Sequence, residues 1–148
     1  MNEQMFSVTG GLAMVGWLAL VLLPRVEFVV RVLTRLLIPS LIAVVYLYLM
    51  ASNLGQAPAE GGFNSLEGVK ALFTVDELLL AGWIHYLAFD LFVGSWEVED
   101  AQRHSVPHLL LVPCLFATFM AGPAGLLIYL ILRTIVGLVR GRAQEATA

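Results

Sequence analysis

The stretch from Gly82 to His108 reads GWIHYLAFDLFVGSWEVEDAQRHSVPH and concentrates the titratable side chains of this chain. It begins in apolar sequence, passes through an acidic segment and returns to apolar sequence at residues 107–108. A very apolar chain has little reason to gather such groups unless they act together, so we expect the functional site here. The stretch holds all three histidines and four of the 11 acidic residues: His85, His104, His108, Asp90, Glu97, Glu99 and Asp100.

The composition around this stretch is that of a membrane protein. The chain has 148 residues, of which 59% are hydrophobic and only 13% are charged. A typical soluble domain has about 25% charged residues. Several apolar runs approach the length of about 17–25 residues that a helix needs to cross a bilayer. The prediction is an all-α, polytopic membrane protein with one transmembrane domain over residues 1–148 and a flexible tail over residues 140–148.

Other classes of protein are disfavoured. The net charge is −3 and the basic residues are scattered, so nucleic-acid binding is not expected. Cys114 is the only cysteine, which excludes an intramolecular disulfide and a thiolate zinc site. The N-terminus lacks the basic region of a removable leader and of a transit peptide. We therefore expect the first apolar run to be retained and the protein to lie in a bacterial cytoplasmic membrane.

Four membrane spans are predicted, with one short helix between the first two. The third span is expected to begin at Thr74, because Thr74 and Glu77 have the spacing of a capping box. A polar helical stretch should follow it over residues 97–104. The arginines in residues 25–36 are separated by apolar residues, which favours a short helix lying in the membrane interface. The spans are predicted at residues 6–23, 38–54, 74–96 and 106–139, and residues 55–70 form a glycine-rich loop.

The last apolar run is too long for one straight crossing. Its 34 residues would extend about 51 Å at about 1.5 Å per residue. We predict a single span kinked at Gly122-Pro123, and the alternative is a turn followed by a separate fifth helix. With four full crossings, four of the eight basic residues fall on each side of the membrane. The positive-inside rule then gives no orientation.

Helical spacing places several polar side chains of the opening stretch on common faces. Asp90 and Glu97 are seven residues apart and share a face, whereas His85 lies about 140° away from Asp90. Glu97, Asp100 and His104 form a second stripe, which His108 can continue. Three interpretations remain open: a zinc, iron or manganese site, a metal-free acid/base pair, and a structural cluster.

The sequence also resembles a known family. The segments are WIHYLAFDLFVGSW at residues 83–96, EDA at 99–101, PHLLLVPCL at 107–115 and GPAGLLIYL at 122–130. They are similar to the family of the plant abscisic-acid-deficient-four protein, the neoxanthin synthase, whose members are small four-span membrane proteins. The first half is similar mainly in layout, including GWLALVLLPR at residues 16–25.

The resemblance implies an isomerase acting on a carotenoid or related isoprenoid epoxide. Conversion of violaxanthin to neoxanthin opens an epoxide and removes a proton from the polyene, which requires an acid and a base. A divalent metal can replace the acid as a Lewis acid. The residues expected to act as catalytic groups or metal ligands are His85, Asp90, Asp100 and His108, followed by Glu97 and His104.

Two other functions fit the same residues. One is a non-catalytic carotenoid-binding or assembly protein, and the other is a small proton-coupled carrier that uses Asp90 and His85. The expected partners are the lipid bilayer and a hydrophobic substrate that enters laterally between helices. Self-association is left open.

Overall fold

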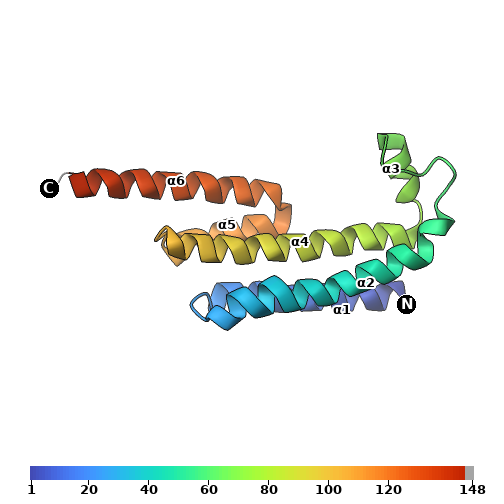
Figure 1. Ribbon diagram of the computed structural model, residues 1–148, viewed down its shortest axis with the longest axis horizontal. Helices are drawn as coiled ribbons and strands as arrows, with labels where there is room; N and C mark the ends of the chain where they lie inside the picture. The colour runs from blue at the N-terminus through green and yellow to red at the C-terminus, as the bar shows by residue number, and fades with distance from the viewer. Residues whose placement is uncertain (146–148) are drawn as a thin grey trace.

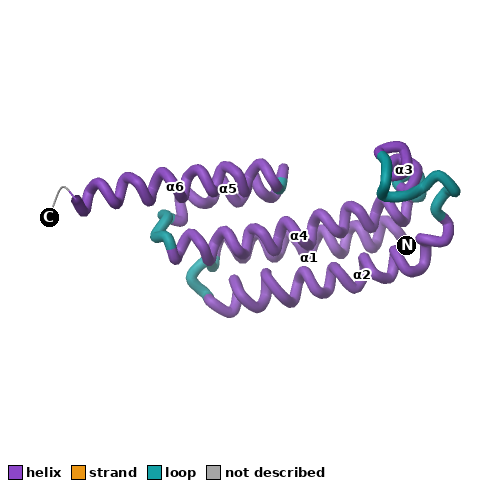
Figure 2. Tube along the Cα trace, turned by 45° about the horizontal axis from the view of Figure 1, so that its top comes forward, coloured by secondary structure: helices purple, strands orange, loops and turns teal. Residues whose placement is uncertain are grey.

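The chain folds into long helices that run along a common direction, and a short helix near residue 70 lies across them (Figures 1 and 2). The computed structural model describes residues 1–145, with side chains described through Arg142, and no strand occurs within that range. The elements are α1 (Asn2–Leu22), η1 (Phe28–Leu37), α2 (Ile38–Asn53), η2 (Leu54–Gln56), α3 (Leu66–Leu72), α4 (Asp76–Arg103), α5 (His108–Ala121) and α6 (Pro123–Glu145). Four of the helical segments in this range are long and apolar enough to cross a membrane, which confirms the predicted class: Asn2–Leu22, Phe28–Gln56, Asp76–Arg103 and Pro123–Arg142. The predicted tail lies partly outside the described residues, and α6 occupies residues 140–145 of it.

The central helix is α4, and α1 packs closely against it. A side chain at Gly94 would meet the Trp17 ring at 2.6 Å, and one at Gly16 would meet Leu91 at 2.6 Å. These two glycines let large side chains of the opposite helix fill the interface. Gly10 and Gly11, also on α1, have no neighbour within 4 Å of such a side chain.

The prediction of a short interfacial helix over residues 25–36 is wrong. Its residues form the π-helical turns of η1, which continue directly into α2 and make one span, Phe28–Gln56. The Thr34 hydroxyl donates to the Val29 and Val30 carbonyls inside these wide turns. Arg31 and Arg35 of this segment contact the Glu99 carboxylate on α4, so the segment packs along α4 instead of lying flat at the membrane surface.

The third span is longer than predicted and begins differently. α4 is one helix of 28 residues that includes the acidic stretch predicted as a separate piece. The capping-box prediction is wrong, because Val75 is the N-cap and the Thr74 hydroxyl donates to the Ala71 carbonyl. The three carboxyl groups in residues 97–100 can be buried within this helix because each has a partner on a neighbouring helix.

The fourth apolar region is a helical hairpin, so the preferred kinked span is wrong and the alternative of a turn and a fifth helix is confirmed. α5 runs back along α4, the chain turns at Gly122, and α6 returns antiparallel to α5 (Figures 1 and 2). Gly122 has φ +29°, a conformation that favours glycine. A side chain at Gly125 would lie 2.0 Å from the Thr118 amide nitrogen, so the two helices touch at their backbones. The turn lies beside Asp90, near the middle of α4.

This contact gives a testable prediction for hairpin stability. Gly125→Ala places a methyl group against the α5 backbone, which cannot move aside as a flexible side chain would. We expect a loss of about 1–3 kcal/mol in the free energy of unfolding, measured by denaturation of the detergent-solubilised protein. Gly137→Ala is the matched control, because nothing lies within 4 Å of a side chain there. Equal stability of the two variants would contradict the backbone contact.

The hairpin also changes the charge balance between the two membrane sides. It returns α6 to the end at which α4 terminates, where Arg133 contacts Asp100. Of the eight basic residues, only Lys70 then lies at the opposite end. The others are Arg25, Arg31, Arg35, Arg103, Arg133, Arg140 and Arg142. The positive-inside rule therefore predicts that this arginine-rich end faces the cytoplasm.

Cysteine labelling can test this topology. In a Cys114→Ala background, Ser105→Cys and Gly141→Cys should react with an impermeant maleimide only after the cells are permeabilised, and Ser65→Cys should react in intact cells. The reason is that the hairpin places residues 105 and 141 on one side of the membrane. Labelling of these two positions from opposite sides would show a full fourth crossing and contradict the hairpin.

Candidate functional site

Asp90 lies in the middle of a membrane span, and one of its two carboxyl oxygens is buried without a partner. Its Oδ2 atom is buried and has no hydrogen-bond partner among the described residues. The carboxyl group faces the hairpin turn, where a side chain at Gly122 would lie 2.7 Å from Oδ1. An ionised group near a bilayer centre costs roughly 2.5–3.5 kcal/mol on insertion scales. An unpaired acid at this depth is therefore a candidate for function.

Tyr86 lies one helical turn before Asp90 and also reaches the hairpin. Its hydroxyl donates to the Phe119 carbonyl at 2.8 Å. Tyr86 lines a groove of about 510 Å³ between α1, α4 and α5. Gly10 and Gly11 form one wall of this groove, and Trp83 and Phe119 belong to the others. The groove is mostly apolar, and its size is typical of a small-molecule site.

Glu97 lies two turns beyond Asp90 and is fully buried. The Thr118 hydroxyl of α5 lies 2.9 Å from Oε1 and 3.1 Å from Oε2, so it donates to this carboxyl group. This pair joins α4 to the hairpin at the same level at which Gly125 contacts Thr118. Glu97 therefore serves the packing of the hairpin, and it is the second carboxyl group on the face of Asp90.

Asp100 joins α4 to α6 near the arginine-rich end. Its Oδ2 atom accepts hydrogen bonds from the Tyr129 hydroxyl and from Arg133 Nη1, the latter at 2.9 Å. His104 Nδ1 lies 3.4 Å from Oδ1 and 2.9 Å from the Asp100 carbonyl oxygen. Each carboxyl oxygen thus has a close partner, which favours a structural role for Asp100.

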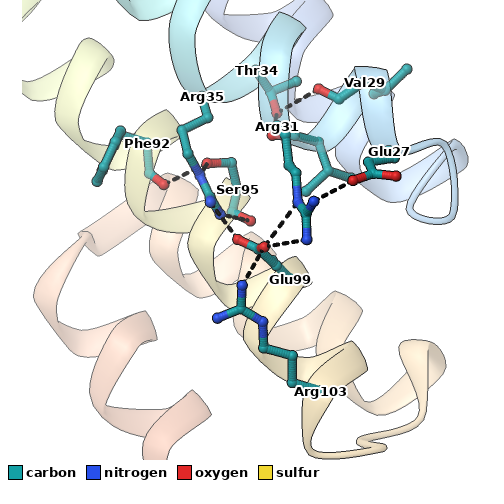
Figure 3. Close-up of polar contacts among 10 residues, drawn as sticks. Glu27, Val29, Arg31, Thr34, Arg35, Phe92, Ser95, Glu99 and Arg103 are labelled. Atoms are coloured by element: carbon teal, nitrogen blue, oxygen red, sulfur yellow. Dashed lines mark hydrogen bonds and ion pairs between the residues drawn. The ribbon is translucent and has the colours of Figure 1, made fainter.

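Glu99 contacts three arginines, of which Arg31 and Arg35 belong to η1 and join it to α4 (Figure 3). Arg31 Nε and Arg103 Nη2 lie 2.9 Å and 2.6 Å from Oε1, and Arg35 Nη1 contacts Oε2. Arg35 also donates to the Ser95 hydroxyl and carbonyl. We call Arg31, Arg35, Arg103 and Glu99 the arginine cluster.

The other predicted histidines lie apart from Asp90. His85 is exposed and stacks on Phe89 with ring centroids 4.6 Å apart. It lines a cavity of about 260 Å³ between α2, α4 and the segment that carries α3, together with Tyr46 and Phe73. His108 begins α5, and its Nε2 atom lies 2.9 Å from the Val21 carbonyl oxygen.

The donor set does not fit a divalent metal. Within the described part of the chain, no three side chains among histidine, cysteine, aspartate and glutamate come close enough to hold one ion. The four residues expected as ligands, His85, Asp90, Asp100 and His108, occupy four separate environments. We therefore derive no chemical step through a metal. What the arrangement offers is acid/base chemistry at Asp90, one helical turn from Tyr86, which lines the apolar groove.

The family match agrees with this arrangement of residues. The chain matches the family described as ABA DEFICIENT 4-like over residues 4–129, which includes α4, the hairpin turn and Tyr129. It belongs to the ABA DEFICIENT 4-like family. Membership is consistent with a role in carotenoid- or abscisic-acid-related metabolism. No curated protein and no solved structure matches the chain significantly.

Two partners of the carboxyl groups were missed in the sequence. Thr118 is the single threonine or serine in the apolar segment 106–133, and an isolated hydroxyl among apolar residues indicates a polar partner on a neighbouring helix. Tyr129 stands in the GPAGLLIYL segment of the family resemblance and meets Asp100 only because the chain turns at Gly122. A hairpin prediction would have brought both residues to α4.

Proposed function

We propose that this family member is a membrane-embedded isomerase that acts on a carotenoid or related isoprenoid epoxide, with Asp90 as the group that moves the proton. The observation that carries the proposal is the unpartnered carboxyl oxygen of Asp90 at the middle of α4. The groove lined by Tyr86, one helical turn from Asp90, is bordered by aromatic side chains and opens between helices, so an apolar polyene can enter it from the lipid.

The proposed reaction requires that one proton is donated to the epoxide oxygen and that one proton is removed from a polyene carbon. A neutral Asp90 carboxyl group donates its proton to the epoxide oxygen, and the C–O bond at the ring carbon next to the polyene breaks. The neighbouring polyene carbon loses its proton to the other Asp90 oxygen, and the electron pair of that C–H bond forms the new double bond of the allene. Asp90 ends in its starting protonation state, and no oxidant or reductant is required.

The surroundings of Asp90 favour its neutral form. A buried carboxyl oxygen without a hydrogen-bond partner, as Oδ2 is here, costs the ionised form more than the neutral acid. The carboxyl group is also held against Gly122, whose lack of a side chain leaves it room. Tyr86 is fixed by the Phe119 carbonyl, so it provides an oriented aromatic wall one turn away. We propose a positioning role for Tyr86.

A second function is a non-catalytic carotenoid-binding protein. It is favoured by the pairing of every other buried carboxyl group in the stretch: Glu97 with Thr118, Glu99 with arginines, and Asp100 with Tyr129 and Arg133. In this case Asp90 would anchor a hydroxyl group of a bound pigment without changing it.

Expression in bacteria engineered to accumulate an epoxy-carotenoid separates the functions. An isomerase yields a new pigment of unchanged mass, and vector-only cells yield none. Co-purification of unaltered pigment alone would favour the binding protein. Transport that requires a proton gradient, without a new pigment, would favour the carrier.

A further inference from the structure

The arginine cluster holds more positive charge than its buried carboxylate needs. Arg35 and Glu99 form the least exposed pair, with side chains 19% and 10% exposed. Arg35 also bonds the Ser95 hydroxyl and carbonyl, so this pair alone satisfies Glu99 Oε2 and much of the guanidinium group. Arg31 and Arg103 share the remaining oxygen and are 48% and 64% exposed. They are not required to neutralise Glu99.

The two exposed arginines have donors to spare. A guanidinium group has five N–H donors. Arg103 makes no hydrogen bond other than that to Glu99 within the described residues. Arg31 additionally contacts Glu27, whose side chain is 73% exposed. Figure 3 shows both guanidinium groups meeting at Glu99 from opposite directions, Arg31 from η1 and Arg103 from the end of α4. Together they present a site for an anion.

The position of the cluster indicates what this anion is attached to. The cluster lies at the arginine-rich end of the spans, where Glu99 and Arg103 belong to the last turns of α4, and next to it η1 exposes Phe28 and Leu36. An apolar groove of about 310 Å³ begins one helical turn away and runs between α2 and α4. Pro39 and Ala43 of α2 line it, together with Ala88 and Phe92 of α4. The arginines are placed for a phospholipid headgroup, and the groove is placed for one of its acyl chains.

We propose that the arginine cluster binds the headgroup phosphate of an anionic phospholipid, whose acyl chain lies in the groove between α2 and α4. Arginine suits this ligand because its planar fork can donate two hydrogen bonds to one phosphate. Basic residues near the membrane surface attract anionic lipids. The bound lipid bridges η1 and the end of α4, two segments that Glu99 already joins.

Native mass spectrometry of the detergent-purified chain tests the proposal. The protein is mixed with equal amounts of phosphatidylglycerol and phosphatidylcholine. We expect retained phosphatidylglycerol on the wild type, and a loss of about tenfold or more in the Arg31→Gln/Arg103→Gln variant. The matched control is Arg140→Gln/Arg142→Gln, which removes the same charge at the same end but outside the cluster, and it should retain the lipid.

Other outcomes overturn the proposal. Equal retention by the cluster variant and the wild type would remove the site, and equal loss in both double variants would reduce it to an effect of net charge. Displacement of the lipid by millimolar inorganic phosphate would show a site for free phosphate. If the double variant does not fold, Arg103→Gln alone gives the same test, because Arg31 and Arg35 remain on Glu99. Ala43→Phe, which fills the groove, should also lower retention, and unchanged retention would overturn the acyl-chain part.

Discussion

Asp90→Asn should abolish most isomerisation while leaving the fold intact. Asparagine has nearly the same shape, but its amide cannot give up a proton to an epoxide oxygen or accept one from carbon. Loss of a general acid or base costs typically 10²–10⁴-fold in rate, and we expect a loss in this range because one group performs both transfers. Turnover is measured by chromatography of the pigments after incubation with the purified protein.

The matched control for Asp90 is Asp76→Asn, the same substitution at an exposed position in the first turn of α4. It should retain wild-type turnover. Thermal denaturation of both variants shows whether folding is preserved. Wild-type turnover by a folded Asp90→Asn protein would remove Asp90 from the reaction.

The largest effect on stability is expected for Glu99→Gln. The substitution leaves Arg31, Arg35 and Arg103 facing one another without the carboxylate that joins them. Removing one partner of a buried ion pair costs about 3–5 kcal/mol. We expect the lower end of this range, because Arg31 and Arg103 are partly exposed and water screens their repulsion.

The control for this substitution is Glu27→Gln. Glu27 contacts Arg31 in the same cluster, but its side chain is 73% exposed, so we expect less than about 1 kcal/mol. The free energy of unfolding is measured for both variants by denaturant titration in detergent micelles. Similar values for Glu27→Gln and Glu99→Gln would contradict the central place of Glu99.

The membrane class and the position of the polar residues were predictable, because hydropathy and residue spacing are local properties. Asp90 and Glu97 share a face of α4 as the seven-residue spacing requires. The direction of the chain at Gly122 was not predictable in this way. A hairpin instead of a kinked span requires the positive φ of Gly122 and is held by contacts that residue spacing does not reveal, such as those of Tyr129 and Arg133 with Asp100.

The same turn explains why the predicted metal ligands do not converge. His85 points to the side of α4 that faces α2, whereas Asp90 faces the hairpin, as their offset of about 140° around the helix implies. Asp100 accepts hydrogen bonds from Tyr129 and Arg133, which lie beside it because the chain turns back in the hairpin. The arginines of residues 25–36 were predicted to reach lipid headgroups, and their convergence on Glu99 depends on the packing of η1 against α4.

The most direct test of the account is conversion of an epoxy-carotenoid by the purified protein in lipid vesicles made with H₂¹⁸O. An isomerase that moves one proton through Asp90 gives a product of the same mass as the substrate, without heavy oxygen, and Asp90→Asn gives almost none. A product that carries oxygen from the water would show hydrolysis of the epoxide, and unchanged pigment would show a binding protein. Either of these results would contradict the proposed isomerase.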